Sequence, residues 1–393
     1  MQNKKMHIFV PYISAFGGVE KLVLSVIEQL RVQGSECRLI CFGDSLDLRA
    51  SSAHPFDVHV LPARRSFLTE ALALRQYLRS AEGAVRGKLL AFDLKSAAYL
   101  ALCRATGYVL HVDDPPSLLP TDITKYAWSG PREKVSPASA TTVSLGLRMR
   151  GEVVHRLISC GVRRANTVVV TTESSAREVN CLYAISSTVV HLGIKLPKRL
   201  VGAEPRPKCP FILLSVGRLE PNKRVEWILE ALSVLEQRIV PLSREVDWHL
   251  EIVGDGGEMN NLKARCQQLG LGNRVVFHGF VPDEQLDGVY ERANLLVMPA
   301  IQGFGIPVME ALAKEIPVVL NRDSRVSELL AGSRWVEIVD DGPGGLAEGI
   351  RKMSCICARE NFDLGPPPCI KSDAQWFEEI ADLCGWRHEA DSL

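Results

Sequence analysis

The feature of this sequence that most limits its fold is a repeated alternation of short apolar runs with amphipathic stretches. In the first half of the chain, apolar runs lie at 6–11, 38–42, 88–92, 108–112 and 167–171. After residue 211 the alternation is cleaner, and five apolar runs alternate with four amphipathic stretches up to residue 320. Buried strands that alternate with helices form parallel sheets with crossover helices. The pattern therefore predicts an α/β protein built from doubly wound sheets.

The alternation breaks once, which suggests a division into two domains. A basic stretch between residues 193 and 210 contains four prolines and has no periodicity, as is typical of a linker. We predict an N-terminal, acceptor-binding domain at 1–195, a linker at 196–210 and a C-terminal domain at 211–365. A helical tail at 366–393 is expected to pack back on the N-terminal domain. The two doubly wound domains are expected to face each other across a cleft.

Composition excludes several classes of protein. Hydrophobic residues make up 46% of the 393 positions and charged residues 23%, which is typical of a globular rather than a disordered chain. No apolar run approaches the ~18 residues of a membrane-spanning helix. The first apolar run breaks at Pro11 without a signal-peptide cleavage site, so we expect a cytoplasmic protein. The eleven cysteines lack the spacing of a disulfide framework or a zinc site, so we expect reduced thiols and no metal.

The net charge of zero hides an asymmetry between the two halves. Residues 1–200 carry a formal charge of +10, and residues 201–393 carry −10. Such a division suggests that the first half meets an anionic partner. Nucleic acid, a membrane surface and a phosphate-bearing substrate all remain open on this ground alone.

Two loops that follow predicted strands are candidates for binding an anion. Gly17 and Gly18 follow the first strand, where glycine lets backbone N–H groups approach a phosphate, although a tight turn without a ligand explains them equally well. Arg218 and Lys223 follow the strand at 211–216 and flank the start of a helix. Cations beside the positive end of a helix dipole favour an anion site over two solvated surface charges.

A third loop, at 302–312, combines a glycine-rich turn with a glutamate that the sequence pattern places on an apolar surface. Gly303 and Gly305 precede a predicted helix. Pro307 lies in its first turn, where proline is favoured. Glu310 lies about one turn into that helix on an otherwise apolar surface, where a carboxylate is costly unless it binds something. A carboxylate that only complements the helix dipole is the alternative.

The second and third loops resemble motifs of glycosyltransferase family 4, the group 1 glycosyl transferases. The segments Gly254-Asp255-Gly256-Gly257-Glu258 and Phe277-His278-Gly279 between them match the same family. The resemblance extends over nearly the whole chain and is strongest between residues 214 and 320. It implies a GT-B fold, with two Rossmann-like domains, and a retaining transferase that uses a nucleotide sugar.

The resemblance also implies a role for each matching residue. Arg218 and Lys223 would be catalytic, because they stabilise charge on the departing diphosphate without a metal or other cofactor. Glu310 would bind the ribose, and the backbone of residues 303–306 would hold the sugar and phosphates. The donor-binding residues are then Gly17, Gly18, Gln302, Gly303, Phe304, Gly305, Ile306 and Glu310.

Two of the departures from the family pattern bear on the site itself. The family has a glutamate where this chain has Gln302, and an amide lacks the charge that binds sugar hydroxyls strongly. Many members also place a catalytic histidine at the end of an N-terminal strand. By that pattern Asp113 rather than His111 occupies the catalytic position. We expect Asp113 to line the cleft and His111 to point to the other face of the strand.

The expected acceptor is a glycan or a lipid-linked glycan. Basic residues and leucines are interleaved at 62–88, and such a surface suits peripheral contact with an anionic membrane at its inner, cytoplasmic face. The prediction is a hexosyltransferase of cell-surface polysaccharide biosynthesis, such as lipopolysaccharide, with no nucleic-acid partner. The alternative is a catalytically silent nucleotide-binding protein derived from such an enzyme. A dinucleotide-dependent oxidoreductase is disfavoured, because no Gly-x-Gly-x-x-Gly fingerprint is present.

Overall fold

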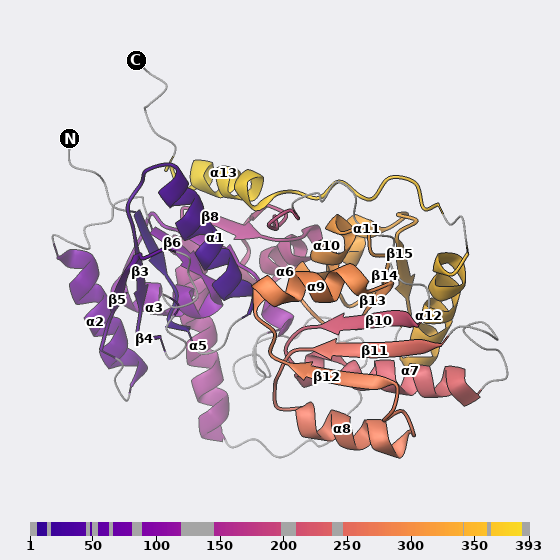
Figure 1. Ribbon diagram of the computed structural model, residues 1–393. Coiled ribbons are helices and arrows are strands. Elements are labelled where there is room, and N and C mark those ends of the chain that lie inside the picture. The colour runs from indigo at the N-terminus through magenta and orange to yellow at the C-terminus, as the bar shows by residue number, and fades with distance from the viewer. Residues whose placement is uncertain are drawn as a thin grey trace. The chain divides into compact units, whose positions relative to one another are not determined.

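The chain folds into two compact units, shown in the computed structural model of Figure 1. The first unit comprises Met1–His191 together with Asp373–Leu393, and the second comprises Leu192–Ser372. The structure describes residues 6–13, 17–44, 48, 54–62, 66–80, 89–118, 145–197, 210–237, 247–340, 342–359 and 363–386.

The first unit is built on a seven-stranded parallel sheet with the order β5-β3-β1-β6-β7-β8-β9. Its strands are β1 (Met6–Phe9), β3 (Cys37–Cys41), β5 (Asp57–Val60), β6 (Leu89–Phe92), β7 (Val109–Val112), β8 (Thr167–Val170) and β9 (Thr188–Val189). A separate pair joins β2 (Tyr12–Ile13) to β4 (Gly43–Asp44). Every residue of β1, β6 and β7 is buried, as expected for strands covered on both faces.

The helices of the first unit cover this sheet (Figure 1). They are α1 (Gly18–Val32), α2 (Phe67–Arg79), α3 (Asp93–Cys103), α5 (Leu145–Arg164), α6 (Glu173–Tyr183) and α13 (Asp373–Leu383), with a 3₁₀ turn η1 (Pro116–Leu118). Helix α5 packs closely on α3 because Gly161 has no side chain, and a Cβ there would overlap the carbonyl oxygen of Ala97. Helix α13 comes from the end of the chain and contacts α1. Its Trp376 and Phe377 are fully buried.

The second unit holds a six-stranded parallel sheet with the order β12-β11-β10-β13-β14-β15. The strands are β10 (Phe211–Val216), β11 (Trp248–Val253), β12 (Val275–Gly279), β13 (Leu295–Met298), β14 (Val318–Asn321) and β15 (Val336–Val339). The helices are α7 (Val225–Gln237), α8 (Met259–Gln268), α9 (Asp283–Arg292), α10 (Ile306–Ala313), α11 (Ser327–Leu330) and α12 (Pro343–Cys357), with a 3₁₀ turn η2 (Pro221–Lys223).

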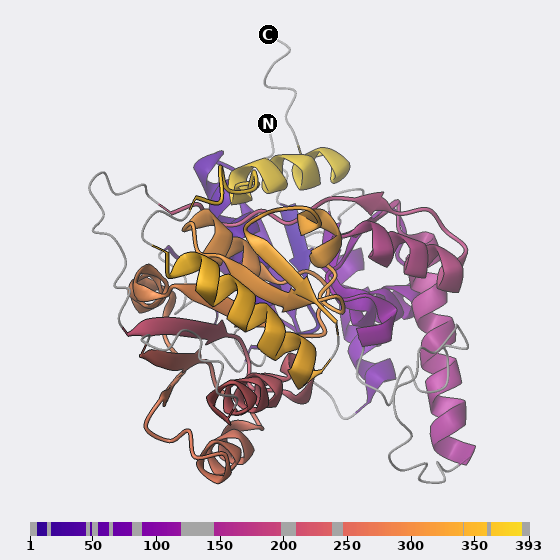
Figure 2. The same cartoon turned by 90° about the vertical axis from the view of Figure 1, so that its right-hand side faces the viewer.

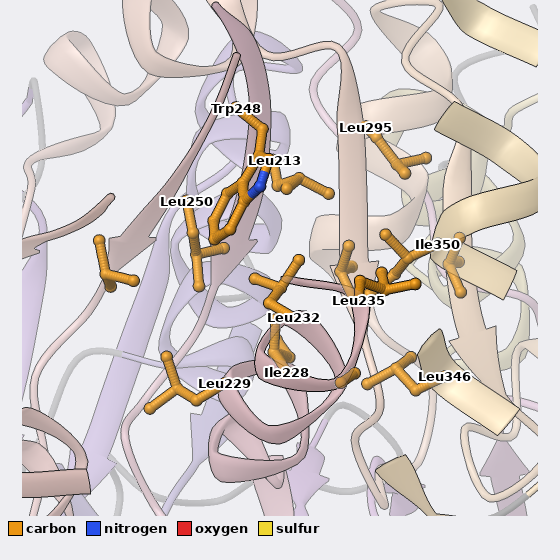
Figure 3. Close-up of a cluster of buried hydrophobic side chains, with 14 of the residues drawn as sticks. Leu213, Ile228, Leu229, Leu232, Leu235, Trp248, Leu250, Leu295, Leu346 and Ile350 are labelled. Carbon is orange, nitrogen blue, oxygen red and sulfur yellow. The ribbon is translucent and has the colours of Figure 1, made fainter. Parts of the chain in front are cut away.

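The core of the second unit lies between its sheet and the neighbouring helices α7 and α12 (Figures 1 and 2). Helix α7 directs Ile228 and Leu232 toward Leu213 and Trp248 of the strands, while Ile350 of α12 completes the cluster (Figure 3). Apolar residues at helical spacing on α7 therefore form one buried stripe. This packing fixes the strands, and with them the loops at their carboxyl ends.

The predicted fold class is confirmed: strands and helices alternate around two parallel, Rossmann-like sheets. The boundaries between elements differ in detail from the sequence expectation. The sequence shows one amphipathic stretch after the apolar run at 211–216, but the structure has η2, a break at Arg224 and then α7. Most of the predicted linker, residues 198–209, lies outside the described residues.

Candidate functional site

Each sheet reverses its strand order beside its first strand. In the second unit β10 lies between β11 and β13, and in the first unit β1 lies between β3 and β6. In doubly wound folds, ligands bind outside the carboxyl ends of the strands at such a reversal. The loops that follow β10 and β13, and those that follow β1 and β6, are therefore the expected ligand-binding loops.

Backbone hydrogen bonds join the loops after β10 and β11. The Gly217 N–H donates to the Val253 carbonyl at 3.0 Å, and the Leu219 N–H donates to the Asp255 carbonyl at 2.8 Å. Gly254 has a φ of +132°, and a Cβ on it would overlap the Gly217 carbonyl oxygen. A glycine is required there both by the backbone conformation and by the close approach of the two loops.

The loop after β10 presents the two predicted cations. The side chain of Arg218 is exposed, and it has no hydrogen-bond or ion-pair partner among the described residues. Lys223 ends η2, and its Nζ donates to Gln302 Oε1 at 3.0 Å. A second contact ties η2 to the loop after β13, because the Ile301 N–H donates to the Asn222 carbonyl at 2.8 Å. The structure thus brings Lys223 and Gln302 together, as the shared edge of the sheet predicts.

Arg224 explains why the helix does not begin directly after Lys223. Its φ is +51°, a left-handed conformation that glycine adopts more easily. Its guanidinium Nη1 donates to Asp323 Oδ2 at 2.6 Å and lies 4.1 Å from the ring centre of Trp227. These contacts hold the residue in a conformation that is otherwise unfavourable.

Helix α10 begins where the sequence predicts, after Gly305 with a φ of +104° and with Pro307 in its first turn. Glu310 Oε2 accepts a hydrogen bond of 2.8 Å from the Tyr290 hydroxyl of α9. Burial, together with the neighbouring Glu310 charge, raises the pKa of Tyr290 well above its usual range, so this hydroxyl remains a donor. Sequence reasoning missed Tyr290, because its helical spacing marks it only as a core residue of α9.

The loops of the first unit contain one further acid that the sequence analysis missed. Gly17 caps α1 and Gly18 is its first residue, while residues 14–16 lie outside the described residues. Asp93 follows β6, beside the reversal of strand order, and has a φ of +71°. Burial and the nearby charges of Asp113 and Asp114 raise its pKa to about 6, although Lys95 opposes the shift. A non-glycine residue with positive φ in a sheet-edge loop is a common feature of functional sites.

His111 and Asp113 do not lie on opposite sides, as the sequence analysis expected. His111 Nδ1 lies 3.1 Å from Asp113 Oδ1. Positions two apart along an extended chain point to the same side, which is why that expectation was wrong. His111 is fully buried between the rings of Phe92 and Trp376, with centroid distances of 5.3 and 5.7 Å. Asp113 is the more exposed of the two.

Among the described residues, no three His, Cys, Asp or Glu side chains are grouped so that they could hold a metal ion. None of the described helices combines the length and the apolar character that crossing a bilayer requires.

These loops belong to a recognisable class of domain. Residues 199–353 match the family model of the glycosyl transferases group 1. The matched segment contains Arg218, Lys223, Gln302 and Glu310 and all six strands of the second unit. This segment is therefore similar to a group 1 glycosyl transferase domain, and the loops after β10 and β13 lie within it.

Individual relatives agree with this class. The GDP-mannose-dependent alpha-(1-6)-phosphatidylinositol monomannoside mannosyltransferase of Mycolicibacterium smegmatis is 28% identical over 137 residues, 33% of this chain and 34% of the relative. The lipopolysaccharide 1,6-galactosyltransferase of Salmonella typhimurium is 25% identical over 173 residues, 42% of each chain. The chain spans at most about half the length of the curated relatives that it matches.

Solved structures extend the likeness to both units at the level of the fold. The Anabaena protein HepE, solved in complex with UDP and glucose, superimposes with a TM-score of 0.67 over 97% of this chain and 99% of HepE, at 16% identity. Structural neighbours of this kind are GT-B glycosyltransferases. The chain has the GT-B fold.

Proposed function

We propose that this protein is a retaining, metal-independent glycosyltransferase of family 4. It would transfer a hexose from a nucleoside-diphosphate sugar to a glycan or lipid-linked glycan in cell-surface polysaccharide biosynthesis. The observation that carries the proposal is the pair of cations, Arg218 and Lys223, in the loop at the carboxyl end of β10. An exposed guanidinium without a carboxylate partner among the described residues suits a phosphate ligand.

The proposed chemistry depends on where charge develops. As the bond between sugar and diphosphate breaks, negative charge grows on the departing phosphate and positive charge grows on the anomeric carbon. Arg218 and Lys223 would stabilise the phosphate, and preorganised donors of this kind each contribute about 3–4 kcal/mol. Glu310, held by Tyr290, would accept hydrogen bonds from the ribose hydroxyls. In the first unit, the amides of Gly17 and Gly18 would bind the diphosphate.

Asp113 is the residue proposed to act on the acceptor. Its side chain follows β7 and is 14% exposed, while both carboxylate oxygens are buried and Oδ1 lies 3.1 Å from His111 Nδ1. Accepting a proton from an acceptor hydroxyl therefore requires that these oxygens become accessible. Attack from the face of the leaving group, with the donor phosphate assisting deprotonation, would retain the configuration of the sugar. No paired-carboxylate machinery is then required.

The first unit also supports a proposal about the acceptor's location. Leu68 and Leu72 are 62% and 59% exposed, and they lie one turn apart on the outer face of α2. Arg79 follows on the last turn of the same helix and is exposed. Exposed leucines beside basic residues favour the surface of an anionic bilayer. The proposal is therefore a cytoplasmic enzyme that contacts the inner face of the membrane.

A second candidate function follows from Gln302. A group 1 domain that lacks the family's glutamate at this position could bind a nucleotide without turning over a sugar. Nucleotide binding is common to both candidates, and only transfer separates them.

The first experiment measures the melting temperature of the protein with UDP, GDP, ADP and CMP, for the parent and for Glu310→Ala. A ligand at 100 times its Kd adds about 2.7 kcal/mol of stability. If one nucleotide raises the melting temperature of the parent but not that of Glu310→Ala, the result supports the donor site and identifies the base of the donor. Radiolabelled sugar transfer to a lipid-linked acceptor then separates enzyme from silent binder. A parent unaffected by all four nucleotides contradicts both candidates.

A further inference from the structure

Gln302 is buried and engaged by its neighbours rather than presented to a ligand. Its side chain belongs to the loop between β13 and α10 and is 6% exposed. Its Oε1 accepts from Lys223 Nζ at 3.0 Å, and its Nε2 donates to Ser324 Oγ at 3.0 Å. The same Nε2 lies 3.1 Å from Met298 Sδ.

The surroundings fix which way the carboxamide faces. A thioether sulfur accepts and cannot donate, so the NH₂ group must face Met298, and the oxygen must face Lys223. Gly305 permits this arrangement, because a Cβ on it would overlap Gln302 Nε2. The backbone is also tied, since the Arg325 N–H donates to the Gln302 carbonyl at 3.1 Å. Gln302 is therefore held from three sides, and among the described residues its oxygen accepts from the ammonium of Lys223.

We infer that Gln302 is a positioning residue for Lys223, whose neutral carboxamide holds the ammonium in place without forming an ion pair with it. This inference rests on the proposed function, in which Lys223 binds the donor diphosphate. Gln302 then acts through Lys223 and makes no contact with the sugar of the donor. The role differs from the direct donor binding that the family resemblance implies for this position.

The choice of amide over carboxylate has a physical consequence. A glutamate in the same place would pair with Lys223 and offset its charge next to the phosphates. A carboxylate would also lack the N–H that faces Met298 Sδ, so the side chain would lose part of its anchoring. The uncharged carboxamide of Gln302 orients the Lys223 ammonium and does not offset its positive charge, which therefore still attracts an anion.

The test compares Gln302→Glu and Gln302→Leu with the parent. Gln267→Glu is the matched control, because it makes the same charge change at an exposed position of α8 in the same unit. The dissociation constants of UDP and GDP are measured by calorimetry between 20 and about 300 mM NaCl, a range over which screening of exposed charges grows strongly. We expect Gln302→Glu to weaken binding about tenfold or more and to flatten its dependence on salt.

Gln302→Leu is expected to weaken binding about three- to tenfold while the dependence on salt remains, because the charge of Lys223 is kept and only its position is lost. Gln267→Glu should change binding less than about twofold. A residue that merely packs would affect the melting temperature without altering the salt dependence. Equal salt dependence in Gln302→Glu and the parent, or tighter binding by Gln302→Glu, overturns the inference.

A measurement without ligand separates this inference from the proposed function. Melting temperatures of Gln302→Leu, Lys223→Met and the double variant form a thermodynamic cycle. Non-additive shifts support the contact between the two side chains, and additive shifts contradict it. Non-additive shifts in a protein that binds neither UDP nor GDP would overturn the proposed function and the diphosphate role of Lys223, while the contact itself would stand.

Discussion

At the scale of single residues, Arg218 is the most direct test of the donor site. Replacing it by alanine removes an exposed guanidinium that has no partner among the described residues, so the fold should be unaffected. If it stabilises the departing diphosphate, we expect kcat to fall about 10²- to 10³-fold. Steady-state kinetics and a melting curve measure the two effects separately.

Arg322→Ala is the control for this prediction. Arg322 is an exposed arginine of the second unit, paired with Asp340 at 3.0 Å, and its loss should leave kcat within about twofold. Full activity in Arg218→Ala, with a normal melting curve, would contradict the leaving-group role.

Asp93 provides a prediction about pH. The folded protein raises the pKa of this carboxyl from 3.8 to about 6, so the folded state binds the proton more tightly than the unfolded state. The stability that this proton provides is complete below pH 4 and is lost as the pH rises through 6. The ionised carboxylate then costs up to about 3 kcal/mol at pH 7. Asp93→Asn should remove this cost, and asparagine tolerates the positive φ.

The measurement for Asp93 is urea unfolding of the parent and Asp93→Asn at pH 4, 5, 6 and 7. The difference between the two proteins isolates Asp93 from the other titrating groups. The groups that face it are Lys95 on its own helix, and Asp113 and Asp114 from the loop after β7. We expect the variant's advantage to grow between pH 4 and pH 7. A difference that does not vary with pH would show that Asp93 does not titrate in this range.

The sequence predicted the positions of the site better than its contacts. Arg218, Lys223 and Glu310 were predicted to lie in segments that follow strands, and the structure places them after β10 and β13; their roles in donor binding stay predictions. Tyr290 and Ser324 were missed, because each reaches the site through a contact between residues about twenty positions apart in the chain. Such contacts depend on how helices pack, which local periodicity does not encode.

At the scale of elements, the contact between α3 and α5 yields a sharp prediction. Gly161→Ala would place a methyl group against the Ala97 carbonyl, so α5 must move away from α3. Overpacking of this kind costs about 1–3 kcal/mol or more. Thermal unfolding should show a lower midpoint for this variant.

Gly288→Ala is the matched change for Gly161→Ala. Gly288 also lies inside a helix, α9, but it is exposed and a Cβ there meets nothing. Alanine should stabilise that helix by about 0.5–1 kcal/mol. Equal effects of the two substitutions would mean that the α3–α5 contact is not tight.

The exposed face of α2 is the element that tests membrane contact. Leu68→Ser with Leu72→Ser should reduce sedimentation with vesicles of anionic lipid at least about threefold, because each buried CH₂ contributes about 0.8 kcal/mol. Melting should be unchanged, since both side chains are exposed. Val276→Ser, an exposed apolar residue of the second unit, is the control. If the double substitution leaves vesicle binding unchanged, the membrane contact does not lie on α2.

At the scale of the whole molecule, α13 completes the first unit from the far end of the chain. Trp376→Ala should cost about 3–5 kcal/mol, because this fully buried side chain packs against His111. The loss should appear in the unfolding of the first unit and leave that of the second unchanged. Hydrogen exchange followed by mass spectrometry resolves the two units. Increased exchange confined to Leu192–Ser372 would contradict the assignment of α13.

The two connections between the units run side by side. The chain leaves the first unit after His191 and returns to it at Asp373. Ile194 forms a parallel bridge with Ser372, and its N–H donates to the Lys371 carbonyl at 3.1 Å. During synthesis on the ribosome, α13 emerges only after all of residues 192–372. Until then, α1 and the ring of His111 lack their contacts with α13. The first unit is completed only after the second has been synthesised, so a nascent chain of this protein would offer chaperones an apolar surface until α13 emerges.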